Sequence, residues 1–376
     1  MNKSEVKYIN MGEQINIIIA SDEQYLCHAT ITIISILSNT KSKSIMFYFL
    51  DEGIGKENRE YIEWEVNKLN GNIKFINIDK EIFSKFYISG HIRQSAYYRL
   101  IAPNLLPVDA EKAIYVDSDL IVGDDIVKLF KENIDEYIIG AVEDSKQDLN
   151  RLKGLGINNQ HYFNSGVLLI NLIKWREANV TEKAFQFAID NPAKLIYWDQ
   201  DTLNAVLGGE WYQLDTKWNV QTVFFELEEY KKVCSNPSII HFTTDIKPWH
   251  IYSEHPYRQL YLEYREKTRW NNISLINDRL LDRMSLGTKL IVFGTGNHAE
   301  RIVGNLPFEV AYFVDNDERK YRTIFLDKLV NKPSSILSEN KDDIAVIIAS
   351  MYTKEIGNQL KKLGFEKDIH FFELHS

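Results

Sequence analysis

The sequence predicts an α/β protein in which a large domain, built on a mostly parallel sheet, is followed by a small second α/β domain. Short apolar runs rich in β-forming residues alternate with segments of helical periodicity through the first part of the chain, which is the pattern of a doubly wound parallel sheet. The alternation starts again after Gly287, behind a stretch rich in charged and aromatic residues. Ligands of such sheets bind beyond the carboxyl ends of the strands, so functional residues are expected at the strand ends.

We expect the first strands at 15–20, 44–51 and 73–78, and the first helices at 27–38 and 56–69. The loop that follows the first strand contains Asp22 and Tyr25. Asp22 could accept a hydrogen bond from a base N–H group, and Tyr25 could stack on a ring. Considered alone, the two are better explained as a loop aspartate and a half-buried aromatic residue.

Arg99 lies in a predicted helix over 95–100 and is flanked by apolar residues. An arginine in this setting is unusual unless its charge is paired, and its partner is expected to be an acidic site or a phosphate. An exposed arginine on an amphipathic helix explains the pattern equally well.

Two aspartates follow the buried strand expected at 113–116. Asp117 and Asp119 are separated by Ser118, and the apolar run resumes at Leu120. In an extended segment, residues i and i+2 point the same way, so the two carboxylates can converge, and they repel each other unless a cation lies between them. A hard divalent ion such as Mg²⁺ or Mn²⁺ suits oxygen ligands. A solvated turn at the end of an edge strand is the alternative.

Three later stretches also place polar side chains at the ends of predicted strands or helices. A strand at 138–142 is followed by Glu143 and Asp144, which could contact an acceptor hydroxyl or form a turn. Small residues at 164–166 precede a very apolar strand and allow the backbone to approach a ligand closely.

The third stretch, 197–204, combines two carboxylates and an amide with aromatic residues at the start of a helix. Asp199 or Asp201 can be the helix N-cap, and Asp199 considered alone is interpreted as the cap.

A strand at 239–241 ends on His241, whose imidazole can ligate a borderline metal such as Mn²⁺. Six residues later, Lys247 precedes Pro248 and Trp249, which stiffen the loop. A lysine there is a good point charge for phosphate. In isolation, a core histidine and a surface lysine are the commoner cases.

Composition restricts the classes of function. Of 376 residues, 44% are apolar, and 53 acidic against 44 basic residues give a formal charge of −9, which argues against nucleic-acid binding. Cys27 and Cys234 lack metal-ligand spacing and are expected to be ordinary thiols in a reducing compartment. The N-terminus lacks an apolar signal core, and uncharged apolar runs stay below about 18 residues. We therefore expect no transmembrane segment and a cytoplasmic protein, with association with the inner face of the membrane left open.

Taken together, these stretches resemble glycosyltransferase family 8, and most of all the bacterial retaining galactosyl- and glucosyltransferases of lipooligosaccharide and surface-glycan synthesis. The resemblance extends over residues 15–255 and rests on five pieces in the family's order. These are Ala20-Ser21-Asp22-Glu23-Gln24-Tyr25, Tyr115-Val116-Asp117-Ser118-Asp119, Phe163-Asn164-Ser165-Gly166-Val167, Asp199-Gln200-Asp201 and His241-Phe242-Thr243-Thr244-Asp245-Ile246-Lys247-Pro248-Trp249.

The resemblance implies a GT-A fold, a UDP-sugar donor and Mn²⁺, with Mg²⁺ as an alternative. The metal ligands implied in this way are Asp117, Asp119 and His241. The implied donor-binding residues are Ala20, Asp22, Tyr25, Arg99, Asp117, Ser118, Asn164, Ser165 and Lys247. Asp199 and Gln200 are the implied catalytic residues, with Gln200 near the face of the anomeric carbon opposite UDP. Thr244 departs from the family, which usually has glycine there to let the loop lie close to the diphosphate; a threonine alters that contact or contributes a hydroxyl instead.

The predicted function is a metal-dependent retaining transfer of a hexose, with galactose slightly favoured over glucose, to a surface glycan or a glycosylated protein. Because Gln200 is a poor nucleophile, we expect the acceptor to attack on the face from which UDP departs, with a phosphate oxygen taking its proton. The alternatives are a non-catalytic protein that binds sugar nucleotides or glycans, and an NAD-binding enzyme centred on the C-terminal module.

We assign residues 1–255 to the transferase domain, 256–286 to a helical connector and 287–376 to a Rossmann-like module. In the module, Asp315 lies 19 residues after Gly296 of a glycine turn, near the spacing of a ribose-binding acid. The module has about half the length of a full dinucleotide domain, and such a turn is often only a tight connection. We therefore favour a non-catalytic module for docking, oligomerisation or ligand sensing.

Overall fold

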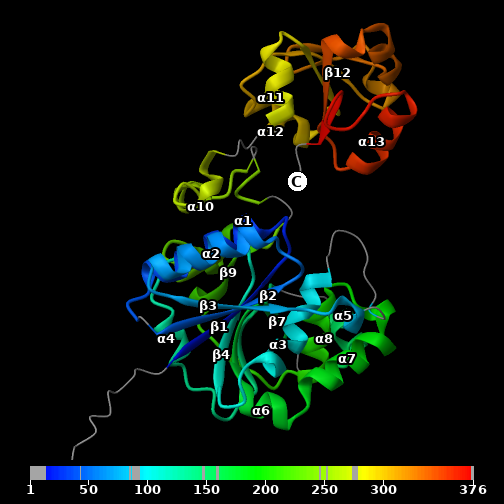
Figure 1. The fold of residues 1–376 in the computed structure, drawn as a ribbon. Helices are drawn as coiled ribbons and strands as arrows, with labels where there is room; N and C mark the ends of the chain where they lie inside the picture. The colour runs from blue at the N-terminus through cyan, green and yellow to red at the C-terminus, as the bar shows by residue number, and fades with distance from the viewer. Residues whose placement is uncertain are drawn as a thin grey trace, which may run out of the picture. The chain divides into compact units, whose positions relative to one another are not determined.

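The computed structural model describes residues 14–42, 44–83, 86, 94–145, 149–157, 161–244, 247–250, 253–272 and 278–373. The chain divides into two compact units, Met1–Thr244 and Asp245–Ser376. Each unit contains its own sheet, with helices on both sides of it (Figure 1).

A seven-stranded sheet forms the centre of the first unit, with the order β3-β2-β1-β4-β7-β6-β8. Its strands are β1 (Ile15–Ser21), β2 (Ile45–Asp51), β3 (Asn72–Asn77), β4 (Lys112–Val116), β6 (Ile139–Glu143), β7 (Phe163–Asn171) and β8 (Tyr212–Gln213). β3, β2, β1 and β4 pair in parallel, whereas β7 pairs antiparallel with both β4 and β6. The sheet is therefore mostly parallel, as predicted, but it is mixed because β7 is reversed.

Helices cover both faces of this sheet (Figure 1). α1 (Leu26–Asn39) and α2 (Lys56–Lys68) lie on one face. The other face packs against α3 (Tyr98–Leu105), α6 (Leu172–Glu177), α7 (Val180–Asp190) and α8 (Trp198–Leu207). Ile18 and Tyr48 point into this second layer, since side chains of a strand alternate between the two faces. Among the described residues of the unit, the other α-helices are α4 (Val127–Phe130), α5 (Leu149–Gly154) and α9 (Lys231–Cys234).

A small second sheet holds the chain after the two aspartates. β5 (Leu120–Val122) pairs antiparallel with β10 (Ile239–His241), which pairs in parallel with β9 (Val220–Gln221). The side chains of β5 and β10 are buried. This sheet joins segments that are more than a hundred residues apart in the sequence and fixes their register.

The second unit begins with the segment that carries α10 (Arg258–Arg265), which is followed by α11 (Asp278–Ser285), α12 (Asn297–Gly304) and α13 (Thr353–Lys362). Its sheet has the order β13-β14-β12-β11-β15-β16. The strands are β11 (Lys289–Phe293), β12 (Val310–Val314), β13 (Ile324–Phe325), β14 (Lys328–Asn331), β15 (Ile344–Ile348) and β16 (Phe371–Glu373). Apart from the β13–β14 hairpin, neighbouring strands are parallel. Counted along the chain, the parallel strands lie in the order 3-2-1-4-5, which is the order of a doubly wound nucleotide-binding sheet.

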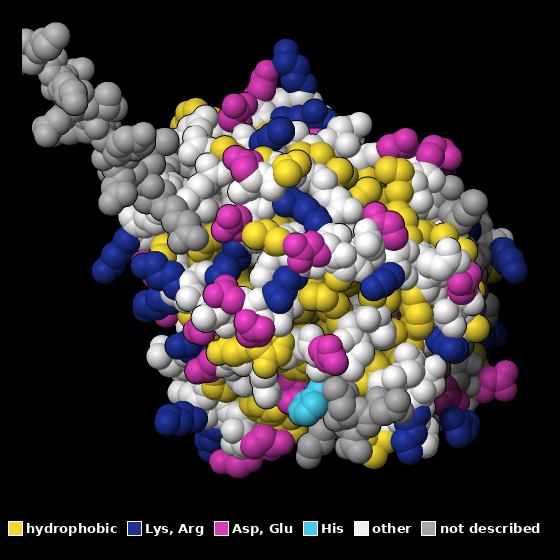
Figure 2. Space-filling view, turned by 90° about the horizontal axis from the view of Figure 1, so that it is seen from below, with side chains coloured by type: hydrophobic (Ala, Val, Ile, Leu, Met, Phe, Trp, Pro, Cys, Tyr) yellow, Lys and Arg dark blue, Asp and Glu magenta, His cyan; other side chains and the backbone are white. Residues whose placement is uncertain are grey.

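Charged side chains of both signs are interspersed over the face shown in Figure 2. In the part of the chain that the structure describes, the helices are too short or too polar to cross a lipid bilayer.

Candidate active site

The carboxyl end of β4 is where the residues singled out in the sequence meet. Asp117 follows Val116, the last residue of β4, and its N–H donates to the carbonyl of Gly166 at 2.8 Å. Val116 pairs with Val167 of the reversed strand β7. Because β7 begins where β4 ends, the small residues at 164–166 lie beside the aspartates.

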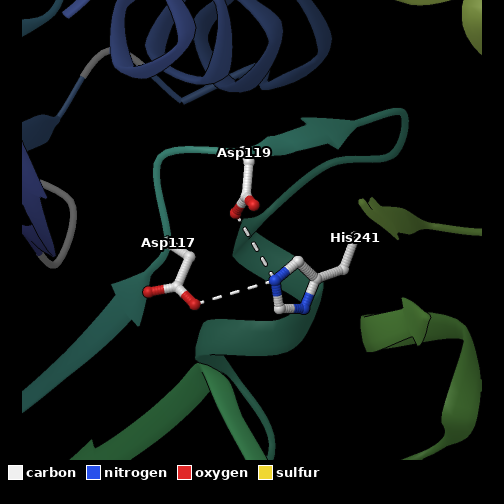
Figure 3. Close-up of side chains that lie close together, drawn as sticks. All are labelled: Asp117, Asp119 and His241. Atoms are coloured by element: carbon white, nitrogen blue, oxygen red, sulfur yellow. Dashed lines mark ion pairs between the residues drawn. The ribbon is translucent and has the colours of Figure 1, made fainter. Parts of the chain in front are cut away.

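Asp117, Asp119 and His241 converge on one point (Figure 3). His241 pairs with Leu120 across β10 and β5, and this pairing sets the imidazole beside both carboxylates. His241 Nε2 lies 3.7 Å from Asp117 Oδ2 and 3.5 Å from Asp119 Oδ1. One ligand atom from each residue lies within 4.8 Å of the others. Two carboxylate oxygens and an imidazole nitrogen form a donor set that fits Mn²⁺ or a similar divalent cation.

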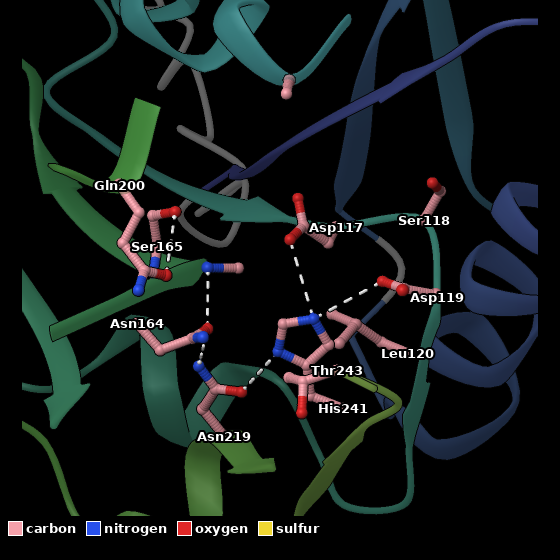
Figure 4. Close-up of polar contacts among 12 residues, drawn as sticks. Asp117, Ser118, Asp119, Leu120, Asn164, Ser165, Gln200, Asn219, His241 and Thr243 are labelled. Carbon is pink, nitrogen blue, oxygen red and sulfur yellow. Dashed lines mark hydrogen bonds and ion pairs between the residues drawn. The ribbon is translucent and has the colours of Figure 1, made fainter. Parts of the chain in front are cut away.

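Asn219 determines which nitrogen of His241 carries the proton (Figure 4). The N–H of Gly166 donates to the side chain of Asn164 at 3.0 Å, which identifies the accepting atom as the amide oxygen Oδ1. Asn219 Nδ2 donates to the same oxygen at 2.9 Å, which turns Asn219 Oδ1 toward His241 Nδ1, 2.9 Å away. An amide oxygen only accepts, so Nδ1 carries a proton, and in the neutral imidazole the lone pair of Nε2 faces the carboxylates. A second residue that orients a histidine in this way is typical of metal sites.

Gly166 leaves space that the three side chains need. A Cβ atom added at this position would lie 2.2 Å from His241 Cε1 and 2.7 Å from Asp117 Oδ2. Both distances are far inside van der Waals contact, so any larger residue would push two of the candidate ligands away. The small residue therefore allows a close approach of protein side chains, in addition to the approach of a ligand expected from the sequence.

Arg99 connects the candidate metal ligands to α8. Its side chain is 7% exposed, with Nη2 lying 2.8 Å from Asp117 Oδ1 and Nε 2.9 Å from Asp199 Oδ2. Nη1 donates to the carbonyl of Ser165 at 2.6 Å and to its hydroxyl at 2.9 Å. The prediction of a paired arginine is confirmed, and the exposed alternative is wrong. Arg99 pairs with Asp117 and Asp199, while Asp119 lies beside Asp117. Three carboxylates against one guanidinium leave an excess of negative charge that a divalent cation would balance.

Burial and charge pairing determine the protonation states in this cluster. Burial raises the pKa of Asp199 to about 6, although the charge of Arg99 opposes the shift. Burial also disfavours the charged form of Arg99, but Asp117 and Asp199 outweigh it and raise its pKa above the ordinary value. Burial raises the pKa of Tyr115 well above its ordinary value. The neutral Tyr115 hydroxyl donates to Asp117 Oδ1 at 3.1 Å.

The family model for glycosyl transferase family 8 matches residues 16–252. The chain belongs to glycosyl transferase family 8. A second family model, described as C2185-like, N-terminal, matches residues 286–369.

Relatives of this glycosyltransferase agree with the assignment. General stress protein A of Bacillus subtilis (strain 168) is 34% identical over 276 residues, which are 69% of this chain and 96% of that protein. A lipopolysaccharide 1,2-glucosyltransferase of Escherichia coli is 29% identical over 286 residues, 73% of this chain and 84% of that protein. The crystal structure of the galactosyltransferase LgtC with donor and acceptor sugar analogs matches with a TM-score of 0.62 and 24% identity, covering 68% of this chain and 96% of that one. The predicted GT-A fold is thereby confirmed.

In the glycosyltransferase, Asp199 does not cap α8 as the sequence alone suggests. The N-cap residue is Tyr197, and it makes no side-chain cap bond. Asp199 accepts from the hydroxyl of Ser165 at 3.0 Å and pairs with Arg99. A buried cation outcompetes the backbone N–H groups for this carboxylate. Asp201 binds the backbone instead, accepting from two N–H groups just before the helix, both at 2.7 Å.

Gln200 of the glycosyltransferase is held at both ends of its amide. Its Oε1 accepts from the N–H of Ser165 at 3.0 Å, and its Nε2 donates to Asp144 Oδ2 at 2.8 Å. Asp144 also accepts from Asn164 Nδ2 at 3.2 Å. Asp144, which follows β6, therefore belongs to the site, whereas Oε1 of Glu143, the last residue of β6, lies 3.5 Å from His161 Nδ1.

The loop after β1 lies at the same edge of the sheet as the aspartates, because β1 pairs in parallel with β4. Ala20 is in the last part of β1, and Asp22 Oδ1 accepts from the N–H of Tyr25 at 2.8 Å. The carbonyl of Ser118 accepts from the hydroxyl of Thr32 at 3.0 Å. The donor-binding roles of these residues stay predictions.

Lys247 belongs to the second compact unit, where its N–H donates to His250 Nδ1 at 3.1 Å. Thr244 is the last residue of the first unit. Asp245 and Ile246, which complete the fifth matching piece, lie outside the described residues. The contact of this loop with a diphosphate stays a prediction.

Asn219 is the member of the site that reasoning from the sequence missed. It ends the short 3-10 helix Thr216–Asn219 and is fully buried. Its one signal in the sequence is a polar residue between the apolar Trp218 and Val220. That signal does not distinguish an orienting residue from an ordinary core amide.

Proposed function

We propose that this family 8 glycosyltransferase transfers a hexose from a UDP-sugar to a glycan or glycosylated protein with retention at the anomeric carbon and dependence on a divalent metal, Mn²⁺ being preferred. The observation that carries the proposal is the convergence of Asp117, Asp119 and the Nε2 lone pair of His241, whose tautomer Asn219 sets. Residues 1–255 would perform the transfer, and residues 256–286 would connect them to a separate module at 287–376.

In this proposal Asp117, Asp119 and His241 hold the metal, which when bound would neutralise charge on the diphosphate. Lys247 would add a positive charge at the phosphates. Asp22 and Tyr25 would bind the uracil from the loop after β1, next to Ala20. Ser118 would contact the donor from between the two aspartates. Arg99, Asn164 and Ser165 would surround the donor sugar.

Transfer requires that the bond between C1 and the phosphate oxygen breaks while a bond from the acceptor oxygen to C1 forms. The anomeric carbon is oxocarbenium-like at this point. In the mechanism that we propose, the acceptor approaches on the face from which UDP leaves, and its proton passes to a phosphate oxygen of UDP. Gln200, fixed by Asp144 and Ser165, would present its amide oxygen to the opposite face and stabilise the developing positive charge.

The surroundings of the two neighbouring carboxylates support this mechanism over a covalent intermediate. Asp199 is paired with Arg99 and accepts from Ser165. Asp201 is fully buried and accepts from the hydroxyl of Tyr162 at 2.6 Å as well as from backbone N–H groups. A carboxylate engaged in this way would have to leave its partners to attack a sugar. Mass-spectrometric detection of a glycosyl adduct on either residue during turnover would replace same-face attack by double displacement.

The donor sugar is proposed as galactose, with glucose second. The E. coli relative is named a glucosyltransferase and the solved LgtC a galactosyltransferase, so both hexoses occur among similar proteins. The two sugars differ in the configuration of one hydroxyl group, and the acceptor is proposed only as a class.

The first experiment is the release of UDP from a panel of UDP-sugars without acceptor, in Mn²⁺ and in EDTA. We expect hydrolysis of one or two UDP-hexoses that EDTA abolishes. Turnover that EDTA leaves unchanged would reject the metal site, and failure to bind UDP in Mn²⁺ would reject the donor class. Binding without turnover calls for repeating the assay with glycan acceptors, and persistent inactivity there would favour the binding-only alternative.

A further inference from the structure

The second unit contains a crevice at the point where its strand order reverses. β11, the first parallel strand along the chain, lies between β12 and β15. The chain runs from β11 to β12 on one side of it and later crosses to β15 on its other side. In open α/β sheets this switch point is where ligands bind, beyond the carboxyl ends of the strands. A crevice of about 870 Å³ lies there, lined by residues that follow β11, β12 and β15. This volume is within the range of small-molecule sites, roughly 300–1,000 Å³.

The two glycines of the turn after β11 have different reasons to be glycine. Gly294 has a φ of +120°, and a Cβ there would lie 2.4 Å from the carbonyl oxygen of Ala349, so the fold requires it. Gly296 has a φ of −100°, and a Cβ there would meet no atom within 4 Å. The fold therefore does not require glycine at 296. Its missing side chain opens the approach to the first turn of α12, whose N-cap it is.

The end of β12 contributes a fixed carboxylate to the crevice. Asp315 accepts from the hydroxyl of Thr295 at 2.5 Å, from Lys320 Nζ at 3.0 Å and from the N–H of Asp317 at 2.9 Å. Burial opposes ionisation, but these donors prevail and lower the pKa of Asp315. A carboxylate has about four acceptor positions, so one remains for a ligand. An ionised carboxylate accepts a hydroxyl but repels a phosphate.

The residues after β15 offer an apolar contact to the same crevice. Met351 and Tyr352 line it, although they are 86% and 66% exposed. Large side chains that remain exposed beside a crevice provide a surface on which an aromatic ring can stack. The charged side chains of the opposite wall are already paired, since Arg319 Nη2 lies 2.9 Å from Asp317 Oδ2. An anion in the crevice would therefore rely on backbone N–H groups at the start of α12.

From this combination we propose that the crevice binds a nucleoside diphosphate whose ribose has both hydroxyls free. The diphosphate lies over Gly296 and the start of α12, the ribose donates to Asp315, and the base stacks on Tyr352. Two sources carry this group, a sugar nucleotide such as the donor of the transferase and a dinucleotide such as NAD. This site is proposed to bind a ligand and to take no part in the transfer reaction. The proposal therefore stands or fails independently of the function proposed above.

The test is calorimetric titration of the full chain with UDP-galactose, NADH and NADPH. The chain carries Asp119→Asn and the buffer contains EDTA, so that the proposed metal-dependent donor site is silenced. The key variant is Gly296→Asp, which places a carboxylate where the diphosphate is proposed. Aspartate is a good N-cap, so this variant keeps α12. The matched control is Gly304→Asp at the other end of α12, where an added Cβ also meets no atom within 4 Å.

We expect UDP-galactose or NADH to bind with a stoichiometry of one, and which of them binds names the source. Gly296→Asp should weaken this binding at least tenfold, Gly304→Asp should leave it within twofold, and Tyr352→Ala should weaken it several-fold without loss of folding. If NADH is the ligand, NADPH should bind at least tenfold more weakly, because its 2′-phosphate meets Asp315. Absence of any binding that Gly296→Asp weakens would overturn the proposal, and equal binding of NADH and NADPH would overturn the role of Asp315.

Discussion

Replacing Asn219 by leucine tests whether the orientation of His241 matters for metal binding. Leucine has a similar volume but neither accepts from His241 Nδ1 nor donates to Asn164 Oδ1, the two hydrogen bonds of 2.9 Å that Asn219 makes. The imidazole is then free to rotate or to move its proton to Nε2. The lone pair that faces Asp117 and Asp119 is lost in part of the population.

The expected effect follows from the loss of two buried hydrogen bonds. Removing a second residue that orients a metal ligand typically weakens metal affinity about 10–100-fold, which corresponds to roughly 1.4–2.8 kcal/mol. His241 Nδ1 is left without its acceptor, which costs about 1–3 kcal/mol of unfolding free energy, whereas Asn164 Oδ1 still accepts from the N–H of Gly166. Asn219→Asp separates the two effects, because a carboxylate still accepts from His241 Nδ1 but repels Asn164 Oδ1. It should lose stability while keeping metal affinity within a few-fold of the wild type.

The assay is the Mn²⁺ concentration that gives half-maximal hydrolysis of the UDP-sugar, with the thermal midpoint of each variant measured alongside. Thr222→Val is the matched control, since Thr222 bonds the backbone at 241–243 and leaves the imidazole untouched. A folded Asn219→Leu variant with a half-saturation within twofold of the wild type would refute the reasoning. So would an Asn219→Asp variant that loses as much metal affinity as the leucine variant.

Gly166→Ala should lower the rate of metal-dependent hydrolysis at least 100-fold, because its Cβ would lie 2.2 Å from His241 Cε1. Gly154→Ala, where a Cβ meets no atom within 4 Å, should leave this rate unchanged. Asp119→Asn should abolish transfer and weaken UDP binding in Mn²⁺ but not in EDTA, and unchanged activity would remove it from the metal site. Burial raises the pKa of Asp199 to about 6, so the folded protein binds more protons than the unfolded chain between about pH 4 and 6. In EDTA, the contribution of Asp199 to stability should therefore fall as pH rises through this window, by on the order of 2–3 kcal/mol. In Asp199→Asn, the unfolding free energy measured with urea should no longer fall with pH across this window. The same pH dependence in the variant and the wild type would contradict the pKa shift.

The sequence by itself determined the longer apolar strands, the order of the strand–helix units and the residues at the strand ends. It did not predict the short strands β8, β9, β13, β14 and β16. Apolar runs such as 15–20 and 289–293 contain enough consecutive β-forming residues to be recognised locally, and they match β1 and β11. Asp117 and Asp119 were found because residues two apart in an extended chain point the same way. These are short-range properties, which a single segment carries without knowledge of its neighbours.

Only the tertiary structure decided which of these residues meet, and in what state. The reversal of β7 and the pairing of β5 with β10 bring Gly166 and His241 to Asp117, and no local pattern specifies either pairing. The same holds for Asp199, which looks like a helix cap until Arg99 is packed beside it. Asn219 was missed because its function lies in one hydrogen bond to His241, 22 residues away. Contacts between distant segments depend on how the whole core packs, so side-chain roles that depend on them follow from the fold and not from the spacing.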